Sequence, residues 1–232
     1  MHASLPQGED KVRAVRSMFD TIAPRYDLVN KVMTFGVDVV WRHQAVRALS
    51  VPPGSLVLDL ACGTGDFCRE LENSGVRPVG ADSSLGMLTH ARTVSPLLQG
   101  DALALPIRDG YLDGAISGFA LRNFVALEPV FAELARVLRP GGRLALLDVS
   151  VPRNAAVRVT HGFYFNKVVP KVGAALSDRD AYGYLPRSVA YLPPSGRIAE
   201  MLADAGFGAL RHRLLTGGVA QLFTATRKVL AG

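Results

Sequence analysis

Short apolar runs alternate with amphipathic stretches along this chain. Residues 56–60 are apolar at nearly every position, as in a parallel strand covered on both faces, and Gly63 ends the run too early for a helix. Further strands are predicted over residues 77–82, 97–102, 112–120, 143–150, 207–215 and 219–228, and helices over 10–20, from 66 onward, 83–92, 128–138 and 195–205. This alternation predicts a doubly wound α/β fold of the Rossmann-like type. Its sheet is expected to have seven strands, mostly parallel, with an antiparallel strand at or near one edge.

Two regions stand outside the alternation. Residues 1–50 contain an amphipathic helix and a second helical stretch, broken at Gly36, before the first strand. A sheet does not need them, so we predict an N-terminal helical cap over the active site. Residues 153–190 are rich in aromatic residues, and we expect either an inserted apolar lid or ordinary core packing there. With these additions, residues 1–232 are predicted to form a single domain.

The composition limits which cellular compartment and which partners the protein is expected to have. Cys62 and Cys68 have no partners at zinc-binding spacing, so we expect free thiols in a reducing cytoplasm and no metal site. Residues 1–20 lack the apolar core of a signal peptide, and no run approaches the roughly 18 apolar residues that span a bilayer. The formal net charge is +6. A positive net charge could favour binding to nucleic acid or to an anionic membrane surface. Because the charges are scattered along the chain, they are equally consistent with an ordinary solvated surface.

The segment after the first strand carries the candidate chemistry. Asp59 is followed by Gly63-Thr64-Gly65, without the third glycine of a dinucleotide site or the Gly-Lys-Ser/Thr of a phosphate loop. Asp82 ends the next predicted strand 19 positions after Gly63, near the roughly 20 expected for an acid that binds a ribose hydroxyl. A loop without phosphate ligands but with a ribose acid suits a nucleoside cofactor. A plain strand-turn-helix corner, with Asp82 capping the next helix, is the alternative.

This pattern resembles the S-adenosylmethionine (SAM) site of class I methyltransferases. In that fold an acid after the third strand lies beside the adenine. Asp101 is therefore the expected acceptor for the exocyclic amine, a group that only donates. We also count Ser83, which can cap the following helix, among the cofactor-binding residues.

Several separated segments resemble one family, the menaquinone and ubiquinone C-methyltransferases, over nearly the whole chain. They are residues 18–20, 23–27 with Asn30, 58–66, 121–123, 136–142, 182–185 with Ser188, and 217–218. The Phe-Asp, Tyr-Asp and Asn block near the N-terminus and the Leu-Arg-Asn segment are the most specific. The chain has Cys62 and Ala120 where the family often has glycine, and both are small-for-small changes.

The resemblance implies SAM contacts in the glycine turn, after the second and third strands, and at the end of the fourth strand. Together with the loop residues, the predicted cofactor-binding set is Asp59, Gly63, Thr64, Gly65, Asp82, Ser83, Asp101, Ala102, Ser117 and Gly118.

Methylation of a quinol ring carbon needs electron density at that carbon and alignment with the sulfonium methyl. We expect Arg122 and Asn123 to hold the quinol oxygen together with Tyr26. A guanidinium cannot act as a base, so Arg122 would stabilise the oxyanion or hold the water that takes the proton. Asp66 is a candidate proton acceptor. Structural roles stay open: Arg122 pairing with Asp27, Asn123 capping a helix, and Tyr26 packing.

The expected reaction is SAM-dependent C-methylation of a prenylated quinol, with demethylmenaquinol favoured over a ubiquinone-pathway quinol. The prenyl tail would enter an apolar channel lined by residues 153–190, and the protein would touch the inner face of the membrane without crossing it. No nucleic-acid partner is expected, and the oligomeric state stays open, a homodimer included. Two other functions remain: an RNA methyltransferase, and a SAM-binding subunit of a quinone-making complex without turnover.

Overall fold

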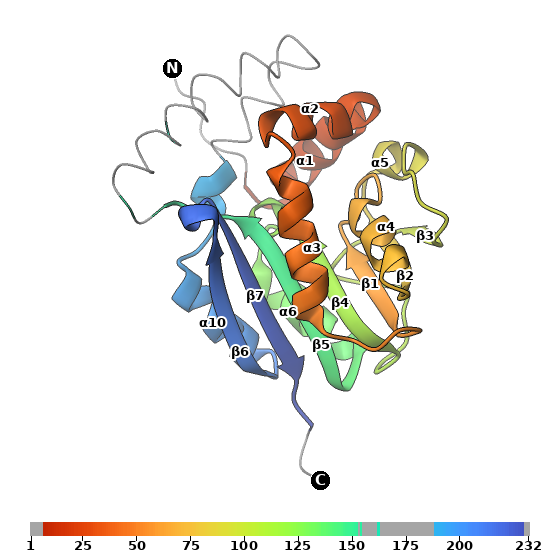
Figure 1. The fold of residues 1–232 in the computed structure, drawn as a ribbon, viewed down its shortest axis with the longest axis vertical. Coiled ribbons are helices and arrows are strands. Elements are labelled where there is room, and N and C mark those ends of the chain that lie inside the picture. Colours follow the sequence, from red (N-terminus) through yellow and green to blue (C-terminus); the bar gives the residue numbers. More distant parts are fainter. Residues whose placement is uncertain (1–6, 153, 155–161, 163–187, 230–232) are drawn as a thin grey trace.

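The protein is built on one sheet with helices on both faces (Figure 1). The computed structural model describes residues 7–152, 154, 162 and 188–229. The strands are β1 (Leu56–Leu60), β2 (Arg77–Asp82), β3 (Leu97–Gln99), β4 (Leu112–Gly118), β5 (Leu138–Val149), β6 (Phe207–Leu215) and β7 (Ala220–Arg227), in the order β3-β2-β1-β4-β5-β7-β6. Only the pairings of β7 are antiparallel among these strands. The predicted seven-stranded, mostly parallel sheet is confirmed.

The helical elements depart from the predicted boundaries in a few places. They are α1 (Gly8–Ile22), η1 (Ala23–Arg25), α2 (Tyr26–Met33), α3 (Val37–Leu49), α4 (Asp66–Asn73), α5 (Leu85–Thr89), η2 (Leu121–Asn123), α6 (Leu127–Val137), η4 (Val189–Tyr191), α10 (Ser195–Asp204) and η5 (Thr216–Gly218). Ser84, not Ser83, caps α5, because its side chain accepts the Met87 N–H at 3.0 Å. β3 ends before Asp101, which forms an isolated bridge with Ala104.

The two faces of the sheet are covered by different helices. Phe131 of α6 and Phe207 of β6 belong to a buried cluster on one side, and Trp41 of α3 and Phe67 of α4 to a cluster on the other. α3 contacts β4, β5 and β7. Residues 37–49, expected as part of a cap over the active site, therefore pack mainly on the sheet, because the apolar face of the strands needs a cover on that side.

The first two helices lie above the carboxyl ends of the parallel strands (Figure 1). Ile22, Val29 and Met33 form a small buried cluster with Met87 of α5. The Asp20 carboxylate accepts bonds from the Ser84 hydroxyl at 2.6 Å and the Gly86 N–H at 2.9 Å. Apolar and polar contacts thus fasten α1 and α2 to α5. The predicted lid lies almost entirely outside the described residues.

None of the described helices has the length and apolar character needed to cross a membrane.

Gly86 leaves no space for a side chain between α1 and α5. A Cβ at this position would lie 2.8 Å from the Asp20 Cα. Gly86→Ala should therefore lower the free energy of unfolding by about 1–3 kcal/mol, as overpacking does, in urea denaturation. Gly196 is also the second residue of its helix, but its Cβ position has nothing within 4 Å. Gly196→Ala should leave stability unchanged or raise it by up to about 1 kcal/mol, and equal losses in both variants would contradict the close approach.

Candidate active site

A cavity of about 620 Å³ opens where the carboxyl ends of β1, β2 and β4 meet the N-terminal helices. Its size is within the roughly 300–1,000 Å³ of small-molecule sites. Eight predicted site residues line it: Tyr26, Gly63, Asp82, Ser83, Asp101, Ala102, Gly118 and Asn123. Six others do not: Asp59, Thr64, Gly65, Asp66, Ser117 and Arg122. The parallel strands thus bring most of the predicted cofactor residues to one place.

Asp82 and the glycine turn form the polar part of this cavity. The Asp82 carboxylate accepts the Gly63 N–H and the Ser84 N–H, both at 2.8 Å. Burial raises the pKa of Asp82, and these N–H bonds oppose that effect. Gly63 has a φ of 55° and open space where a Cβ would be. The turn therefore presents bare backbone and an oriented carboxylate to the cavity.

A second acid stands on the same wall. Asp101 is exposed, and its carboxylate accepts the Leu103 N–H at 2.9 Å, which orients it. Ala102 and Gly100 border the cavity on either side of it. Two carboxylates from the ends of neighbouring strands thus face one cavity.

Other predicted loop residues have structural roles. A Cβ at Gly118 would lie 2.3 Å from the Phe67 ring, so only glycine fits there. Ser117 is buried, and its hydroxyl donates to the Leu60 carbonyl at 2.8 Å, joining β4 to β1. Gly65 has a φ of 82° and forms the turn itself. Gly118 thus lines the cavity directly, whereas Ser117 and Gly65 support its wall from behind.

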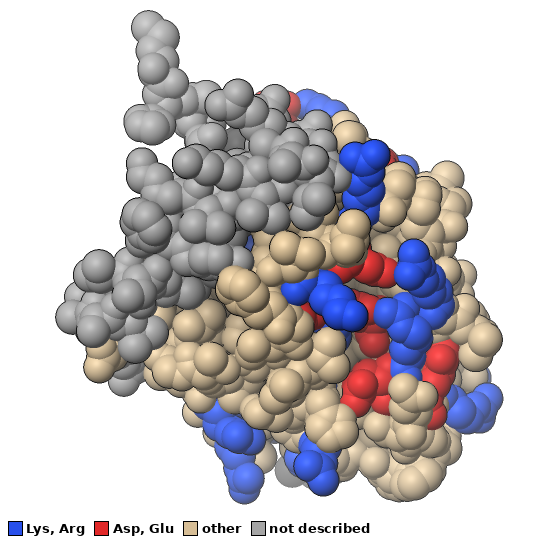
Figure 2. Space-filling view, turned by 45° about the horizontal axis from the view of Figure 1, so that its top comes forward, with Lys and Arg blue, Asp and Glu red and all other residues tan. Residues whose placement is uncertain are grey.

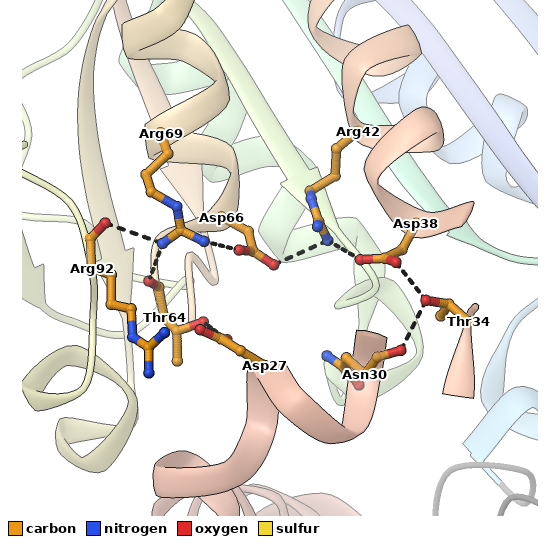
Figure 3. A network of polar contacts seen from close by, with 9 residues as sticks. All are labelled: Asp27, Asn30, Thr34, Asp38, Arg42, Thr64, Asp66, Arg69 and Arg92. Atoms are coloured by element: carbon orange, nitrogen blue, oxygen red, sulfur yellow. Dashed lines mark hydrogen bonds and ion pairs between the residues drawn. The ribbon is translucent and has the colours of Figure 1, made fainter. Parts of the chain in front are cut away.

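Thr64 links the glycine turn to the N-terminal helices (Figure 3). Its hydroxyl donates to the Asp27 carboxylate of α2. The same network continues through ion pairs of Arg42 with Asp38 at 2.7 Å and with Asp66 at 3.0 Å. Figure 2 shows acidic and basic side chains interspersed in the right-hand part of the view, with further basic side chains at its lower edge.

Asp66 is not placed to accept a proton from a substrate. It lines neither cavity, and both of its oxygens are engaged, one by Arg42 and one by Arg69. Burial raises its pKa, and the two guanidinium groups oppose that shift. The prediction that Asp66 is the proton acceptor is therefore not supported, because the first turn of α4 directs this side chain into the ion-pair network.

A second cavity of about 220 Å³ adjoins the first. Tyr26 and Phe119 line both cavities and so form the wall between them. Most of the second lining is apolar, from Met33, Phe35, Val37, Trp41, Val149 and Val219. Arg122 supplies a cation to this cavity. Arg42 and Asp38, which pair with each other at 2.7 Å, also line this cavity. A mostly apolar space that contains the Arg122 guanidinium suits a ring or chain that carries a developing negative charge.

Arg122 is held by partners that the sequence did not indicate. Its guanidinium forms a buried ion pair with Asp148, at the end of β5, and its Nε donates to the Ser188 hydroxyl at 3.1 Å. Asp148 is fully buried and Arg122 is 7% exposed. The alternative in which Arg122 pairs with Asp27 is not seen among the described residues, where the ion pair of Arg122 is with Asp148. The guanidinium also borders the smaller cavity.

Tyr26 and Asn123 both line the larger cavity, and Tyr26 lines the smaller one as well. Burial raises the pKa of the Tyr26 hydroxyl, and its hydrogen bond with Asn30 opposes this. Tyr26 is therefore a neutral donor at neutral pH, not a base. The Asn123 amide donates to the Phe119 carbonyl at 3.4 Å, and the N-cap residue of the following helix, α6, is Ala126 rather than Asn123.

Asp59 lies under the glycine turn rather than in the cavity. It is 1% exposed, its Oδ2 accepts from the Cys68 thiol at 3.4 Å, and its Oδ1 has no hydrogen-bond partner among the described residues. Burial raises its pKa to about 7. Cys62 and Cys68 are both free and buried beside it.

Some lining residues were absent from the predicted set. Val12, Val15, Arg16 and Phe19 of α1 border the larger cavity. Their helical spacing indicated an apolar face, but not whether that face met a core or a ligand. Asp148 could have been predicted as a site residue from the sequence, because it is an acid near the end of a buried strand, as Asp59 and Asp82 are.

The fold and the cavities together define the class of protein. The strand order, with a glycine turn after β1 and an acid after β2 at one cavity, belongs to class I SAM-dependent methyltransferases. A SAM-dependent methyltransferase of Thermotoga maritima has the same fold, with a TM-score of 0.66 at 21% identity over 92% of this chain and 99% of that one. Phosphoethanolamine N-methyltransferase 2 of Haemonchus contortus was solved in complex with S-adenosyl-L-methionine. Its TM-score is 0.60 at 14% identity, over 91% of this chain and 60% of that one.

Sequence comparison then identifies the family. Residues 7–227 match the ubiE/COQ5 methyltransferase family, and the chain belongs to it. A demethylmenaquinone methyltransferase of Mycolicibacterium paratuberculosis is 43% identical over 218 residues, which are 93% of this chain and 94% of the relative. The ubiquinone/menaquinone biosynthesis C-methyltransferase UbiE of Syntrophotalea carbinolica is 39% identical over 223 residues, 92% and 94% of the two chains. The family resemblance seen in the sequence is confirmed.

The raised pKa of Asp59 predicts a specific pH dependence of stability. Between about pH 4 and 7 the unfolded chain loses the Asp59 proton while the folded chain keeps it. Stability therefore falls as the pH rises through this window, by about 4 kcal/mol in total. Asp59→Asn should lack this fall, so the difference in unfolding free energy between wild type and variant should change across the window in urea denaturation. A difference that stays constant with pH, as is expected for the exposed control Asp204→Asn, would contradict it.

Proposed function

We propose that this enzyme methylates a ring carbon of demethylmenaquinol, a prenylated naphthoquinol, with SAM as the methyl donor. The observation that carries the proposal is the pair of adjoining cavities that share Tyr26 and Phe119. One cavity has the acids and bare backbone that a nucleoside needs. The other is mostly apolar and is lined by the buried Arg122 and by the Arg42–Asp38 ion pair. Two relatives of this chain, from M. paratuberculosis and from Corynebacterium kroppenstedtii, are named demethylmenaquinone methyltransferases. These names support a naphthoquinol as the substrate. The name of the S. carbinolica relative keeps the ubiquinone-pathway quinol as the second candidate.

The residues of the larger cavity fit SAM. Asp82 retains lone pairs beyond its two backbone N–H bonds, so its carboxylate can accept the ribose hydroxyls. Asp101 can accept the adenine amine, and the space beside Gly63 lets backbone approach the ligand. When bound, SAM supplies an electrophilic methyl group.

Arg122, Tyr26 and Asn123 would hold the acceptor oxygen. The Arg122 cation and the neutral Tyr26 hydroxyl are donors toward a developing oxyanion, and such donors favour ionisation of the neighbouring quinol hydroxyl. Asp148 balances the buried charge of Arg122 and fixes its direction. Neither Arg122 nor protonated Tyr26 can take the proton, so we propose that it passes to water in the cavity.

The prenyl tail would follow the apolar lining of the second cavity toward α2 and α3. The tail channel predicted from residues 153–190 stays a prediction, as do the cytoplasmic location at the inner face of the membrane and the oligomeric state.

The function is tested with the purified full-length enzyme, radiolabelled SAM, and reduced short-tailed forms of both quinols. We expect label on the naphthoquinol ring and at least tenfold slower transfer to the benzoquinol. Preference for the benzoquinol would change the substrate but keep the reaction. SAM binding in calorimetry without transfer to either quinol would instead support a SAM-binding subunit without turnover.

The role of Arg122 is tested together with its partner. Removing Arg122 alone would leave Asp148 buried without a counter-charge, at about 3–5 kcal/mol, so the informative variant is Arg122→Met with Asp148→Asn. We expect kcat to fall about 100-fold or more, as when a donor to an oxyanion is lost, with SAM affinity within about twofold. Arg197→Met with Glu200→Gln removes an exposed pair and should leave kcat unchanged. A folded double variant with wild-type kcat would exclude Arg122 from the reaction.

A further inference from the structure

A stripe of polar residues lies along the wall of the smaller cavity. Its five members follow one another at intervals of four positions and all line that cavity: Tyr26, Asn30, Thr34, Asp38 and Arg42. The first two belong to α2 and the last two to α3, with Thr34 in the turn between these helices. Residues four positions apart lie on one face of a helix. We call these five residues the polar stripe, and it gives a mostly apolar cavity one polar edge.

Neighbouring members of the polar stripe are bonded to one another. The Tyr26 hydroxyl is hydrogen-bonded with the Asn30 side chain. The Thr34 hydroxyl lies 2.8 Å from the Asn30 carbonyl oxygen and also contacts a carboxylate oxygen of Asp38 (Figure 3). The other carboxylate oxygen of Asp38 pairs with Arg42 at 2.7 Å (Figure 3). The polar stripe thus runs from Tyr26, which we assign to the acceptor oxygen, to a carboxylate at the start of α3.

Asp38 has the chemistry that the other polar groups of this cavity lack. Among the described residues that line the smaller cavity, it is the only acid. Its side chain is 4% exposed, so it faces the cavity and its protein partners rather than bulk solvent. Arg122 and the neutral Tyr26 cannot take a proton, whereas a carboxylate within reach of a hydroxyl or a water is a common general base.

The Thr34 hydroxyl suits both protonation states of Asp38. A hydroxyl has one hydrogen to donate and two lone pairs that accept. While Asp38 is ionised, Thr34 donates to it; once Asp38 is protonated, it donates to Thr34, which then donates to the Asn30 carbonyl. Neither state requires a heavy atom to move. Arg42 keeps its ion pair with Asp66 at 3.0 Å when Asp38 becomes neutral, so that cation keeps a counter-charge.

We propose that Asp38 is the final acceptor of the quinol hydroxyl proton, which reaches it through water in the cavity and the Thr34 hydroxyl. This inference rests on the proposed function and deepens it, because it names the group that holds the proton while the methyl group is transferred. The contacts of Asp38 and Thr34 with each other and with the cavity carry it.

The step balances in protons and electrons. The O–H bond of the acceptor breaks as water takes its proton, that water gives a proton to the Thr34 oxygen, and the Thr34 hydrogen moves to Asp38. The electron pair left on the acceptor oxygen is delocalised into the ring, whose carbon forms the bond to the methyl group while the donor sulfur keeps the electron pair of the broken bond. The hydrogen of the methylated carbon then leaves as a proton to water, and Asp38 returns its own proton to the oxygen.

The test uses the purified full-length enzyme, a reduced short-tailed naphthoquinol and saturating SAM. Asp38→Asn keeps the shape of the side chain but removes the base, so kcat should fall about 100-fold. The KM for the acceptor and the affinity for SAM should stay within about threefold of wild type. Thr34→Val removes the hydroxyl and should lower kcat at least tenfold, whereas Thr34→Ser keeps the hydroxyl and should stay within about threefold.

Two comparisons separate a proton acceptor from a structural residue. Asp66 is the other acid paired with Arg42 but lines neither cavity, so Asp66→Asn should keep kcat within about threefold of wild type. A ring-fluorinated naphthoquinol has a more acidic hydroxyl and depends less on a base. With this acceptor the loss of kcat in Asp38→Asn should shrink to below about tenfold, whereas a structural defect would cause the same loss with both acceptors.

Wild-type kcat in either Asp38→Asn or Thr34→Val would overturn the proposal. An equal loss in Asp66→Asn, or a loss in Asp38→Asn that is the same with both acceptors, would also overturn it. If Asp38→Asn does not fold, Thr34→Val and Thr34→Ser measured with both acceptors decide in its place. A wild-type enzyme that methylates neither a naphthoquinol nor a benzoquinol would instead reject the proposed function itself.

Discussion

The register of β1 against its two parallel neighbours is the constraint on which the site depends. Leu60 pairs with Ala81 of β2, and Asp59 with Ile116 of β4, so three strands end at one edge. A slip of β1 by one residue would turn each of its side chains to the opposite face. Helices cover both faces and bury those side chains, so the core resists such a slip. The position of the cofactor turn is thus fixed by packing well below it.

The N-terminal helices depend on that turn in a different way. Besides their apolar contacts, α2 and α3 are joined to the turn and to α4 by hydrogen bonds and ion pairs (Figure 3). Tyr26 directly precedes Asp27, whose carboxylate is bound by Thr64. The same hydrogen bond therefore fixes the turn and the tyrosine at the wall between the cavities. The residues proposed for the cofactor and for the acceptor are thus connected, although 37 positions separate Asp27 from Thr64.

Features with a local sequence pattern could be predicted, and side-chain partnerships over long distances could not. The strands, the glycine turn and Asp82 each follow from spacing within a short window. The partner of Arg122 is Asp148, 26 positions away, because η2 and the end of β5 meet only in the folded sheet. Asp66 has the right residue type for a base, but its direction is set by Arg42 from another helix. Periodicity records which residues are buried, not which charged groups meet.

The wall between the cavities has a consequence for the size of the transferred group. Phe119 has a φ of 59°, in the left-handed region that costs a residue other than glycine roughly 1–2 kcal/mol, and its N–H donates to the Leu147 carbonyl at 2.7 Å. The ring is thus held in place beside Tyr26 by the backbone of the sheet. Tyr26 and Phe119 line both cavities, so a group that passes from one cavity to the other passes these two aromatic side chains. The space beside them therefore sets how bulky that group can be.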